Sequence, residues 1–273
     1  MLARKPGFAA GLSFLYGLPA MATQNPEAWV AEIFCSVQGE APLVGARQVF
    51  VRLAGCHRRC RFCDTPAALV TRPPTWSLEI EPGRNRREKN PVSAIRLADI
   101  LSGLAGGPFH SIAFTGGEPL LQADFLRAAL PRLRRAGWRI YLETSGDRWR
   151  ELRQILPQLD FIAMDIKLPS VTGQAATWQA HRKFLELATT TQAETFVKIV
   201  VGRATNEAEL RRAARLVASV ASQTPVTLQP ATPHAGINAP TAQQLWRWQA
   251  LMLAAGLRDV RVIPQVHVLM GQR

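Results

Sequence analysis

Three of the four cysteines in this chain lie within the eight-residue sequence CHRRCRFC. Their spacing is Cys-x3-Cys-x2-Cys, so three thiolates on one short loop can bind three irons of a four-iron, four-sulfur cube. The fourth iron then keeps an open coordination position, whereas proteins that only transfer electrons usually supply a fourth cysteine. We therefore expect Cys56, Cys60 and Cys63 to hold a [4Fe–4S] cluster that can bind a further molecule.

A structural zinc site is the competing interpretation of these cysteines. Such a site needs four ligands, typically two pairs separated by a dozen or more residues. His57 directly follows Cys56 and cannot easily reach the same ion, and Cys35 fits better as a small buried residue. Because disulfide frameworks usually spread their cysteines, the clustering also indicates a reducing compartment, and we expect a cytoplasmic protein.

Two glycines and a carboxylate form a second motif in the sequence FTGGEP, residues 114–119. Gly116 and Gly117 allow the backbone to approach a ligand closely, and Glu118 offers an anionic acceptor. By itself the motif is equally typical of an ordinary turn between a strand and a helix. Other polar segments that follow apolar runs in the same way are YLETSG, MDIK and LQPAT.

From about residue 29 onward, short apolar runs alternate with longer amphipathic runs. This pattern predicts the strands and helices that must position the motifs. The short runs predict buried strands at Val49–Leu53, Ser111–Thr115, Arg139–Glu143, Phe161–Asp165, Phe196–Val201, Val226–Gln229 and Val260–Ile263. The longer runs predict helices at Val92–Ala105, Gln122–Ala136, Arg148–Leu156, Thr177–Thr189, Asn206–Ala221 and Thr241–Ala255.

This alternation predicts an α/β fold with parallel strands joined by right-handed crossovers. About six such units fall short of the eight in a closed TIM barrel, so we expect a partial, open TIM-like (β/α)6 barrel. Ligands bind at the carboxyl ends of parallel strands, where the polar segments lie. The barrel domain is predicted to span residues 29–273, with an insertion near 71–91 that is dense in proline, glycine and charge.

Residues 1–28 lie ahead of this domain and contain the apolar stretch Phe8–Met21, which superficially resembles a signal peptide. We interpret residues 1–28 as an extension, either disordered or produced by a start site placed ahead of Met21. No stretch reaches the roughly 18 consecutive apolar residues of a membrane-spanning helix, so we expect no membrane partner.

The net charge of +13 raises the question of a nucleic-acid partner. Arginine is spread along the chain, and the one dense basic run, Arg84 to Lys89, has no interleaved aromatic residues. We interpret that run as a solvated loop and expect no direct nucleic-acid partner. A basic surface can instead bind an acidic electron-donor protein.

The cysteine spacing, with Phe62 before the last cysteine, resembles the motif of radical S-adenosylmethionine enzymes. The Gly-Gly-Glu sequence resembles the motif with which those enzymes bind the methionine amino group. The resemblance implies that S-adenosylmethionine binds the open iron and is cleaved by an electron from the reduced cluster. It also implies that the 5′-deoxyadenosyl radical takes a hydrogen atom from a substrate.

The sequences EIFCSVQGE and FVRLAGC before the cluster, DT after it and QVH near the end resemble the 7-carboxy-7-deazaguanine synthase family. The resemblance covers about residues 29–273, apart from the insertion. It implies conversion of 6-carboxy-5,6,7,8-tetrahydropterin to 7-carboxy-7-deazaguanine with loss of ammonia, in the biosynthesis of queuosine and related 7-deazapurines. It also implies Mg2+ as a cofactor, a flavodoxin-type electron donor and a homodimer.

Carried over residue by residue, the resemblance implies three sets of site residues. S-adenosylmethionine is expected to contact Phe62, Cys63, Asp64, Gly117, Glu118, Asp165, Ile166, Lys167, Gln229, Pro230, Ala231 and Thr232. The pterin is expected to contact Val37, Gln38, Gly39, Glu40, Arg52, Thr115, His267 and Arg273, with Arg52 paired to the substrate carboxylate. Thr65 is the expected Mg2+ ligand, since a hydroxyl suits a hard cation that keeps much of its hydration.

The chain departs from the family pattern at several positions. Asp165-Ile166-Lys167 stands where the family often has Ser-Pro-Lys, and Ala41 stands where a glycine commonly follows Gln-Gly-Glu. Arg52 could also be a strand residue paired with a helix carboxylate, and His267 a surface histidine. Two rival functions are another radical enzyme, such as a glycyl-radical activase, and a non-catalytic iron–sulfur or zinc protein that binds nucleic acid.

Overall fold

A ten-stranded sheet runs through the computed structural model, which describes residues 25–81, 83–233 and 236–272. Its parallel strands are β3 (Arg47–Leu53), β7 (Ser111–Gly116), β8 (Ile140–Thr144), β9 (Phe161–Asp165), β10 (Glu194–Val201), β11 (Val226–Pro230) and β12 (Val260–Val262). The helices that follow them are α1 (Ala94–Ser102), α2 (Ala123–Arg135), α3 (Trp149–Ile155), α5 (Trp178–Ala188), α6 (Glu207–Ala221) and α7 (Ala242–Ala254).

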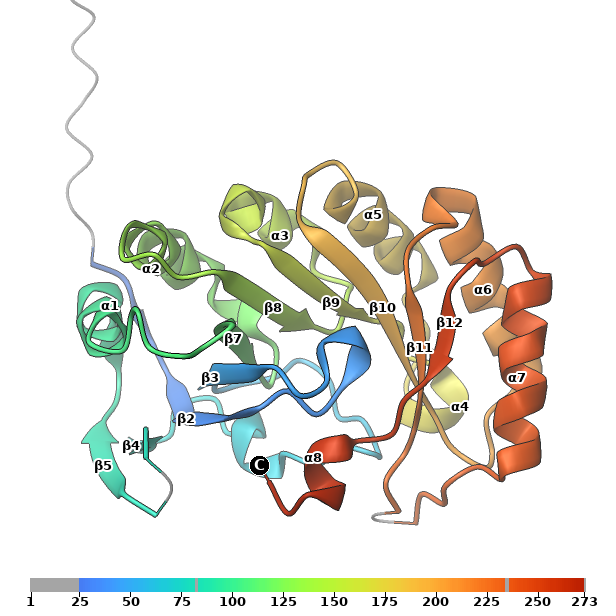
Figure 1. Cartoon of the computed structure of the whole chain (residues 1–273), viewed down its shortest axis with the longest axis horizontal. Helices are drawn as coiled ribbons and strands as arrows, with labels where there is room; N and C mark the ends of the chain where they lie inside the picture. The colour runs from blue at the N-terminus through green and yellow to red at the C-terminus, as the bar shows by residue number, and fades with distance from the viewer. Residues whose placement is uncertain (1–24, 82, 234–235, 273) are drawn as a thin grey trace, which may run out of the picture.

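The sheet curves without closing, and the helices lie along its outer side (Figure 1). Strand order is β12-β11-β10-β9-β8-β7-β3-β2-β4-β5, so β12 and β5 remain at the two edges. Six strand–helix units precede β12, which confirms the prediction of an open, TIM-like (β/α)6 barrel. The predicted strands and helices are all present, with ends that shift by at most a few residues.

Short polar side chains fix where the helices begin. Ser93 accepts a hydrogen bond from the backbone of Arg96 at the start of α1, and Asn206 does the same for Ala208 at the start of α6. Thr241 and Gln244 form a capping box at the start of α7. The remaining short helices are η1 (Ala41–Leu43), η2 (Pro66–Leu69), η3 (Pro119–Gln122), η4 (Leu156–Gln158), α4 (Pro169–Thr172) and α8 (Val266–Leu269).

Side chains of the parallel strands alternate between the helices and the inside of the barrel. In β10, Val197 and Ile199 belong to the core under the helices, whereas Phe196 and Lys198 face inward. Inner faces are apolar first and polar toward the carboxyl end: Phe50 and Arg52 in β3, Ala113 and Thr115 in β7, Tyr141 and Glu143 in β8, Ala163 and Asp165 in β9. The barrel therefore has an apolar base and a polar mouth.

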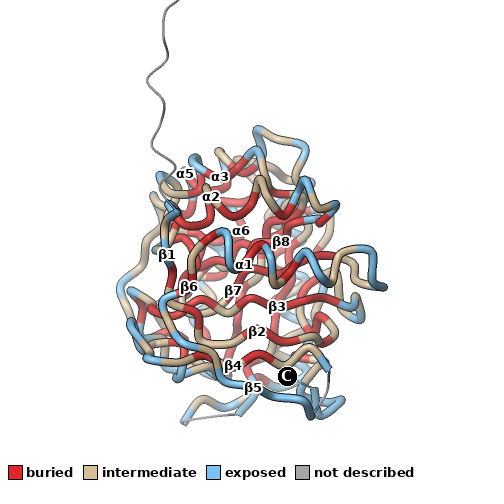
Figure 2. The backbone as a smooth tube through the Cα atoms, turned by 90° about the vertical axis from the view of Figure 1, so that its left-hand side faces the viewer, coloured by how far each residue is buried: buried red, intermediate tan, exposed pale blue. Residues whose placement is uncertain are grey.

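Three strands extend the sheet beyond the predicted barrel. β2 (Val30–Val37) pairs antiparallel with β3, and β4 (Thr75–Glu79) and β5 (Asn85–Lys89) form an antiparallel pair beside it. The interpretation of Arg84 to Lys89 as a solvated loop was therefore wrong, because most of the run forms edge strand β5. Its residues are mostly exposed, as the colouring of β5 in Figure 2 shows, and the strand lacks the apolar alternation that would have predicted it.

The folded part of the chain begins before the predicted boundary at residue 29. β1 (Glu27–Ala28) pairs with β6 (Val92–Ser93), and the Ala28 side chain is fully buried in the core. The predicted extension covered residues 1–28, and its residues 1–24 lie outside the described residues. Within the described ranges, no helix combines the length and the apolar character needed to cross a bilayer.

Candidate active site

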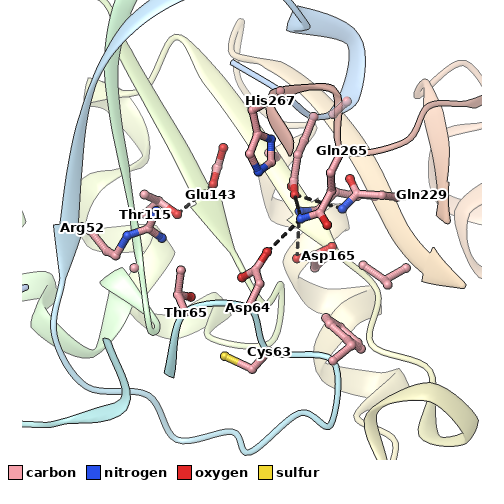
Figure 3. A pocket seen from close by; sticks show the side chains of 18 of the residues that line it. Arg52, Cys63, Asp64, Thr65, Thr115, Glu143, Asp165, Gln229, Gln265 and His267 are labelled. Atoms are coloured by element: carbon pink, nitrogen blue, oxygen red, sulfur yellow. Dashed lines mark hydrogen bonds and ion pairs between the residues drawn. The ribbon is translucent and has the colours of Figure 1, made fainter. Parts of the chain in front are cut away.

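A cavity of about 620 Å³ opens at the carboxyl ends of the parallel strands. The lining residues come from strand β2, the loop Gln38–Ala41, the cysteine loop with the residues just after it, the ends of strands β3 to β11, and the C-terminal segment around Gln265 and His267. Figure 3 shows Arg52 and Thr115 on one side, Asp165, Gln229 and Gln265 on the other, and Cys63 and Asp64 between them. The segments that carried the sequence motifs thus meet around one space.

The three clustered cysteines all line this cavity, so the loop presents Cys56, Cys60 and Cys63 to a common space. Cys35 packs against the core on the helix side of the sheet and is not among the lining residues. In the described ranges, no group of three or more histidine, cysteine or acidic side chains surrounds a position for a single metal ion. The described residues therefore contain no preformed zinc site.

Asp147, just after β8, holds the cysteine loop in place. Nε and Nη2 of Arg58 donate to Asp147 Oδ2 at 3.0 and 2.5 Å, and Arg58 Nη2 also donates to Thr177 Oγ1 at 2.6 Å. The ring of His57 bonds the same carboxylate at 3.1 Å, and this contact raises the pKa of His57 to about 9. Two consecutive residues between the first two cysteines are thus fixed to the barrel.

The side of the cavity where S-adenosylmethionine is predicted to bind carries buried polar atoms that have no partner among the described residues. Asp165 Oδ1 and Gln229 Oε1 are buried and accept no hydrogen bond from the described residues. Unpaired buried acceptors are costly, so both atoms fit a ligand that supplies hydroxyl or amino donors. Lys167 Nζ pairs with the other oxygen of Asp165 at 2.8 Å and lies 5.0 Å from the centre of the Phe62 ring.

Most of the predicted S-adenosylmethionine residues line the cavity, but not all do. Those that line it are Phe62, Cys63, Asp64, Gly117, Asp165, Lys167, Gln229, Ala231 and Thr232. Glu118, Ile166 and Pro230 are not among the lining residues. Glu118 is fully buried and accepts hydrogen bonds from the backbone of Leu120 and Ser145 and from the Thr144 hydroxyl. It therefore ties the end of β7 to the end of β8.

Gly117 lies where the backbone of the cysteine loop passes closest to β7. A Cβ atom at this position would lie 2.1 Å from the carbonyl oxygen of Gly55 and 2.9 Å from that of Ala68. Real Cβ atoms do not approach backbone oxygens so closely, so glycine is required for this packing. The Gly-Gly-Glu motif thus joins the cysteine loop to the barrel.

The pterin residues predicted from the sequence all line the cavity, apart from Arg273, which lies outside the described residues. They are Val37, Gln38, Gly39, Glu40, Arg52, Thr115 and His267; Thr65, the predicted Mg2+ ligand, lines it as well. Gln38 is almost fully buried, and its amide donates to Gln48 and Glu143 at 3.0 and 2.9 Å. Its oxygen accepts the backbone N–H of Glu40 at 3.0 Å, so Gln38 shapes the loop.

Glu40 is held by donors from three elements. Its Oε2 pairs with the ammonium of Lys198, and its Oε1 accepts from the amides of Gln229 and Gln265 at 2.9 and 2.8 Å. Burial alone would raise the pKa of Glu40, but the nearby ammonium and the amide donors hold it below its usual range. Glu40 therefore stays ionised and can accept further N–H donors from a ligand.

Glu143 is a second buried carboxylate in the polar mouth. It accepts from Thr115 Oγ1 at 2.8 Å as well as from Gln38. Burial raises its pKa, with a further upward contribution from Glu40 that the Lys198 ammonium opposes. Both carboxylates are thus stabilised by the Lys198 ammonium, but the pKa of Glu143 is raised and that of Glu40 is lowered.

Arg52 combines a structural contact with a place in the cavity wall. Its Nε donates to Glu32 Oε1 at 2.7 Å, and its guanidinium lies 5.6 Å from the centre of the Phe34 ring. Arg52 therefore pairs with a protein carboxylate, but this carboxylate belongs to strand β2 and not to a helix, as the alternative had it. The contact with Glu32 uses only Nε. The two Nη nitrogens can therefore donate side by side to a ligand carboxylate.

Several residues of the site received no role from the sequence, and three of them make contacts that hold the site together. They are Lys198, Glu143 and Gln265, and each makes contacts with residues that did receive a role. Lys198 could have been noticed as a single charge inside the apolar strand FVKIVV. Gln265 is part of the QVH sequence, but nothing local indicates that its amide reaches Glu40.

Comparisons with known proteins agree with this geometry. The family model described as the radical SAM superfamily matches residues 51–217. In structure the chain resembles QueE from Escherichia coli, with a TM-score of 0.54, 19% identity and coverage of 88% of this chain and 95% of that one. The fold and the cysteine loop therefore define a member of the radical SAM superfamily.

Curated relatives narrow this assignment. A 7-carboxy-7-deazaguanine synthase from Geobacter sulfurreducens is 42% identical over 91% of this chain and 99% of its own length. Another from Thermococcus kodakarensis is 31% identical over 87% of this chain and 96% of its own. The chain belongs to the 7-carboxy-7-deazaguanine synthase family.

Proposed function

We propose that this enzyme converts 6-carboxy-5,6,7,8-tetrahydropterin to 7-carboxy-7-deazaguanine with loss of ammonia, as a step toward queuosine or related 7-deazapurines. Cys56, Cys60 and Cys63 would hold the [4Fe–4S] cluster, and S-adenosylmethionine would bind its open iron. Together the bound groups supply hydrogen-atom abstraction. The observation that carries the proposal is that the cysteines and the Gln38–Glu40 loop line one cavity with Arg52 and Glu143.

The charges of the cavity suit the two ends of the proposed substrate. A carboxytetrahydropterin has a guanidine-like edge rich in N–H donors and a carboxylate elsewhere on the ring system. Ionised Glu40 accepts donors of the first kind, and the Arg52 fork matches the carboxylate. The negative charge of Glu40 and the positive charge of Arg52, which line the same cavity, would fix the orientation of the bound substrate.

The cofactor side offers matching acceptors. The unpaired oxygens of Asp165 and Gln229 suit the ribose hydroxyls and amino groups of S-adenosylmethionine. Asp165 stands where relatives often have the serine of Ser-Pro-Lys, so an acceptor-only carboxylate would replace a hydroxyl at this contact. Phe62, which lies beside Lys167 and lines the cavity, offers an apolar surface.

We include Mg2+ as a third cofactor in the proposal, beside the cluster and S-adenosylmethionine. Thr65 follows Cys63 by two residues and lines the same cavity as Arg52 and Glu40, which supports a metal bound next to the substrate. One protein hydroxyl with substrate oxygens and waters is an acceptable environment for Mg2+, which keeps much of its hydration. Homodimer formation, a flavodoxin-type reductant and a reducing, cytoplasmic setting complete the proposal.

Anaerobic turnover tests the function directly. The reconstituted enzyme is incubated with dithionite, S-adenosylmethionine and the carboxytetrahydropterin, and the products are identified by mass spectrometry. We expect 7-carboxy-7-deazaguanine to form only when both small molecules are present, and not with the Cys60→Ala variant. Cleavage of S-adenosylmethionine without any deazaguanine acid would contradict the proposed substrate and favour another radical reaction.

A further inference from the structure

The side chain of Gln265 joins the two halves of the cavity. Its Nε2 donates one hydrogen to Glu40 Oε1 and the other to Asp64 Oδ2, each at 2.8 Å. Its Oε1 accepts the hydroxyl of Thr232 at 2.5 Å. Gln265 is itself buried, with 8% of its surface exposed, so these contacts are shielded from competing water. Figure 3 shows the amide between Asp64 and Gln229.

The three partners come from distant parts of the sequence. Glu40 lies in the loop after β2, Asp64 directly follows the last clustered cysteine, and Thr232 follows β11. In the proposed function, Glu40 binds the substrate, whereas Asp64 and Thr232 belong to the S-adenosylmethionine side. One side chain therefore connects the residue that orients the substrate with the residues around the cofactor.

The chemistry of an amide suits this junction. The partners are two carboxylates and one hydroxyl, so the bridging group needs two donors and one acceptor, as a primary amide provides. A glutamate here would place a third carboxylate against Glu40 and Asp64, and a lysine would add a cation close to Lys198. Glutamine makes all three contacts without adding charge to a buried site.

We infer that Gln265 is a positioning residue that holds Glu40 at a fixed place relative to the cofactor side of the cavity. This inference rests on the proposed function. Hydrogen-atom transfer depends steeply on the distance between the reacting atoms, and a displacement of about 1 Å can cost about 100-fold in rate. Loss of the bridge therefore affects alignment more than binding of either molecule.

The test compares Gln265→Met with Gln249→Met. Methionine keeps the length of the side chain but removes the amide. Gln249 is a matched control, because its amide donates to the Val260 carbonyl at 2.7 Å between α7 and β12 and does not line the cavity. Three quantities are measured for each variant: turnover at saturating substrate, 5′-deoxyadenosine released per product formed, and dissociation constants for S-adenosylmethionine and substrate by calorimetry.

For Gln265→Met we expect turnover to fall by about 100-fold and the ratio of 5′-deoxyadenosine to product to rise at least about tenfold. Both dissociation constants should change by less than about tenfold, and Gln249→Met should match the wild type in ratio and turnover. An unchanged ratio, or a loss of turnover explained by weaker binding alone, would overturn the inference. If Gln265→Met does not fold, Gln265→Asn keeps a neutral amide but shortens the side chain by one methylene, so it should not reach both carboxylates, and the same rise in the ratio is expected.

Wild-type turnover separates this inference from the proposed function. A wild-type enzyme that makes no deazaguanine acid contradicts the proposed substrate. A wild-type enzyme that makes it, together with an unaltered product ratio in Gln265→Met, contradicts only the positioning role of Gln265.

Discussion

His267 occupies the space that a side chain on Gly39 would need. A Cβ atom on Gly39 would lie 2.0 Å from Nδ1 and 2.5 Å from Cβ of His267. The backbone N–H of Val266 also donates to the Gly39 carbonyl at 2.9 Å. The C-terminal segment therefore rests directly on the Gln38–Ala41 loop, and the missing side chain of Gly39 is what permits this contact.

Replacing Gly39 with alanine should move His267 out of place. Overpacking of this kind typically costs about 1–3 kcal/mol. Here the steric clash lies between the Gln38–Ala41 loop and the C-terminal segment, and both line the proposed substrate region of the cavity. We expect the substrate KM to rise at least about tenfold with a smaller effect on S-adenosylmethionine binding, measured by steady-state kinetics and calorimetry. Gly45→Ala is the control, because a Cβ there meets nothing within 4 Å and only its positive φ of 87° causes strain. Equal KM values for the two variants would exclude the contact as the cause.

Lys198 is the cation shared by the buried carboxylates. Its ammonium pairs with Glu40 and lies 3.6 Å from Asp165 Oδ2. Burial would lower the pKa of Lys198, but Asp165, Glu40 and Glu143 raise it, so it stays charged. Lys198→Met should destabilise the fold by about 3–5 kcal/mol, because it leaves carboxylates without their counter-charge. Urea unfolding checks this, and a loss below about 1 kcal/mol would show that the carboxylates find other partners.

Ionisation of Glu40 should make stability depend on pH in a defined direction. Because the folded state lowers the pKa of Glu40, the ionised form stabilises the fold above the unfolded value of about 4.3. This contribution should disappear as pH falls through the lower folded-state pKa. The free energy of unfolding of wild type minus that of Glu40→Gln, measured on cluster-free protein, should be constant above about pH 5 and shrink in more acidic buffer. A difference that grows toward acid would contradict the assigned direction.

The barrel could be predicted from sequence because its strands are buried on both faces. From Phe196 to Val201, strand β10 reads as an apolar run interrupted only by Lys198, and residues such as Ser93, Asn206 and Thr241 mark the helix starts. Edge strand β5 could not be predicted, although it forms a hairpin with the preceding strand β4, because its charged side chains are mostly exposed. Without an apolar alternation, the local sequence pattern gives no signal for a strand.

For the site, the sequence could predict which motif residues line the cavity but not which hydrogen bonds they make. The cysteine spacing and the Gln38–Glu40 segment place residues on the cavity, but the motif residue Glu118 proves to be buried between strand ends. The contact of Gln265 with Glu40 joins residues 225 positions apart, so it depends on the tertiary fold and not on local sequence. A sequence pattern identifies residue types at a site, whereas their hydrogen-bond partners are set by the fold.

Ala41 adopts a backbone conformation that suggests a stability test. Its φ is +56°, the single positive value among non-glycine residues in the described ranges, and its methyl group is buried. The left-handed conformation costs a non-glycine residue roughly 1–2 kcal/mol. Ala41→Gly removes that strain but also removes a buried methyl, so we expect less than about 1 kcal/mol of net change in unfolding free energy. Ala41→Val should destabilise by more than about 2 kcal/mol, because a β-branched residue tolerates this conformation poorly.

The thiolates of the cysteine loop should be required for the cluster, and Cys35 should not be. Cys56, Cys60 and Cys63 face the cavity, whereas Cys35 packs on the opposite side of the sheet. Any of the three changed to alanine should lose the brown colour and turnover after anaerobic reconstitution, while Cys35→Ala should keep iron content within about 20% of wild type. Iron and sulfide analysis with visible spectra measures both results. A Cys35→Ala variant that lost its iron would show that the cluster is held by a ligand set other than the loop.

Mg2+ dependence should reside in the hydroxyl of Thr65. This side chain lines the cavity, and Thr65 also accepts the backbone N–H of Ala68 through its carbonyl at 3.0 Å, so the backbone position does not depend on the hydroxyl. Thr65→Ala should therefore fold normally but lose the stimulation by Mg2+, with turnover at saturating metal about tenfold lower, or roughly 1.4 kcal/mol. Thr65→Ser keeps the hydroxyl and should restore the response. Titration of activity against Mg2+ at fixed S-adenosylmethionine distinguishes the variants, and an identical metal response in wild type and Thr65→Ala would remove Thr65 as a ligand.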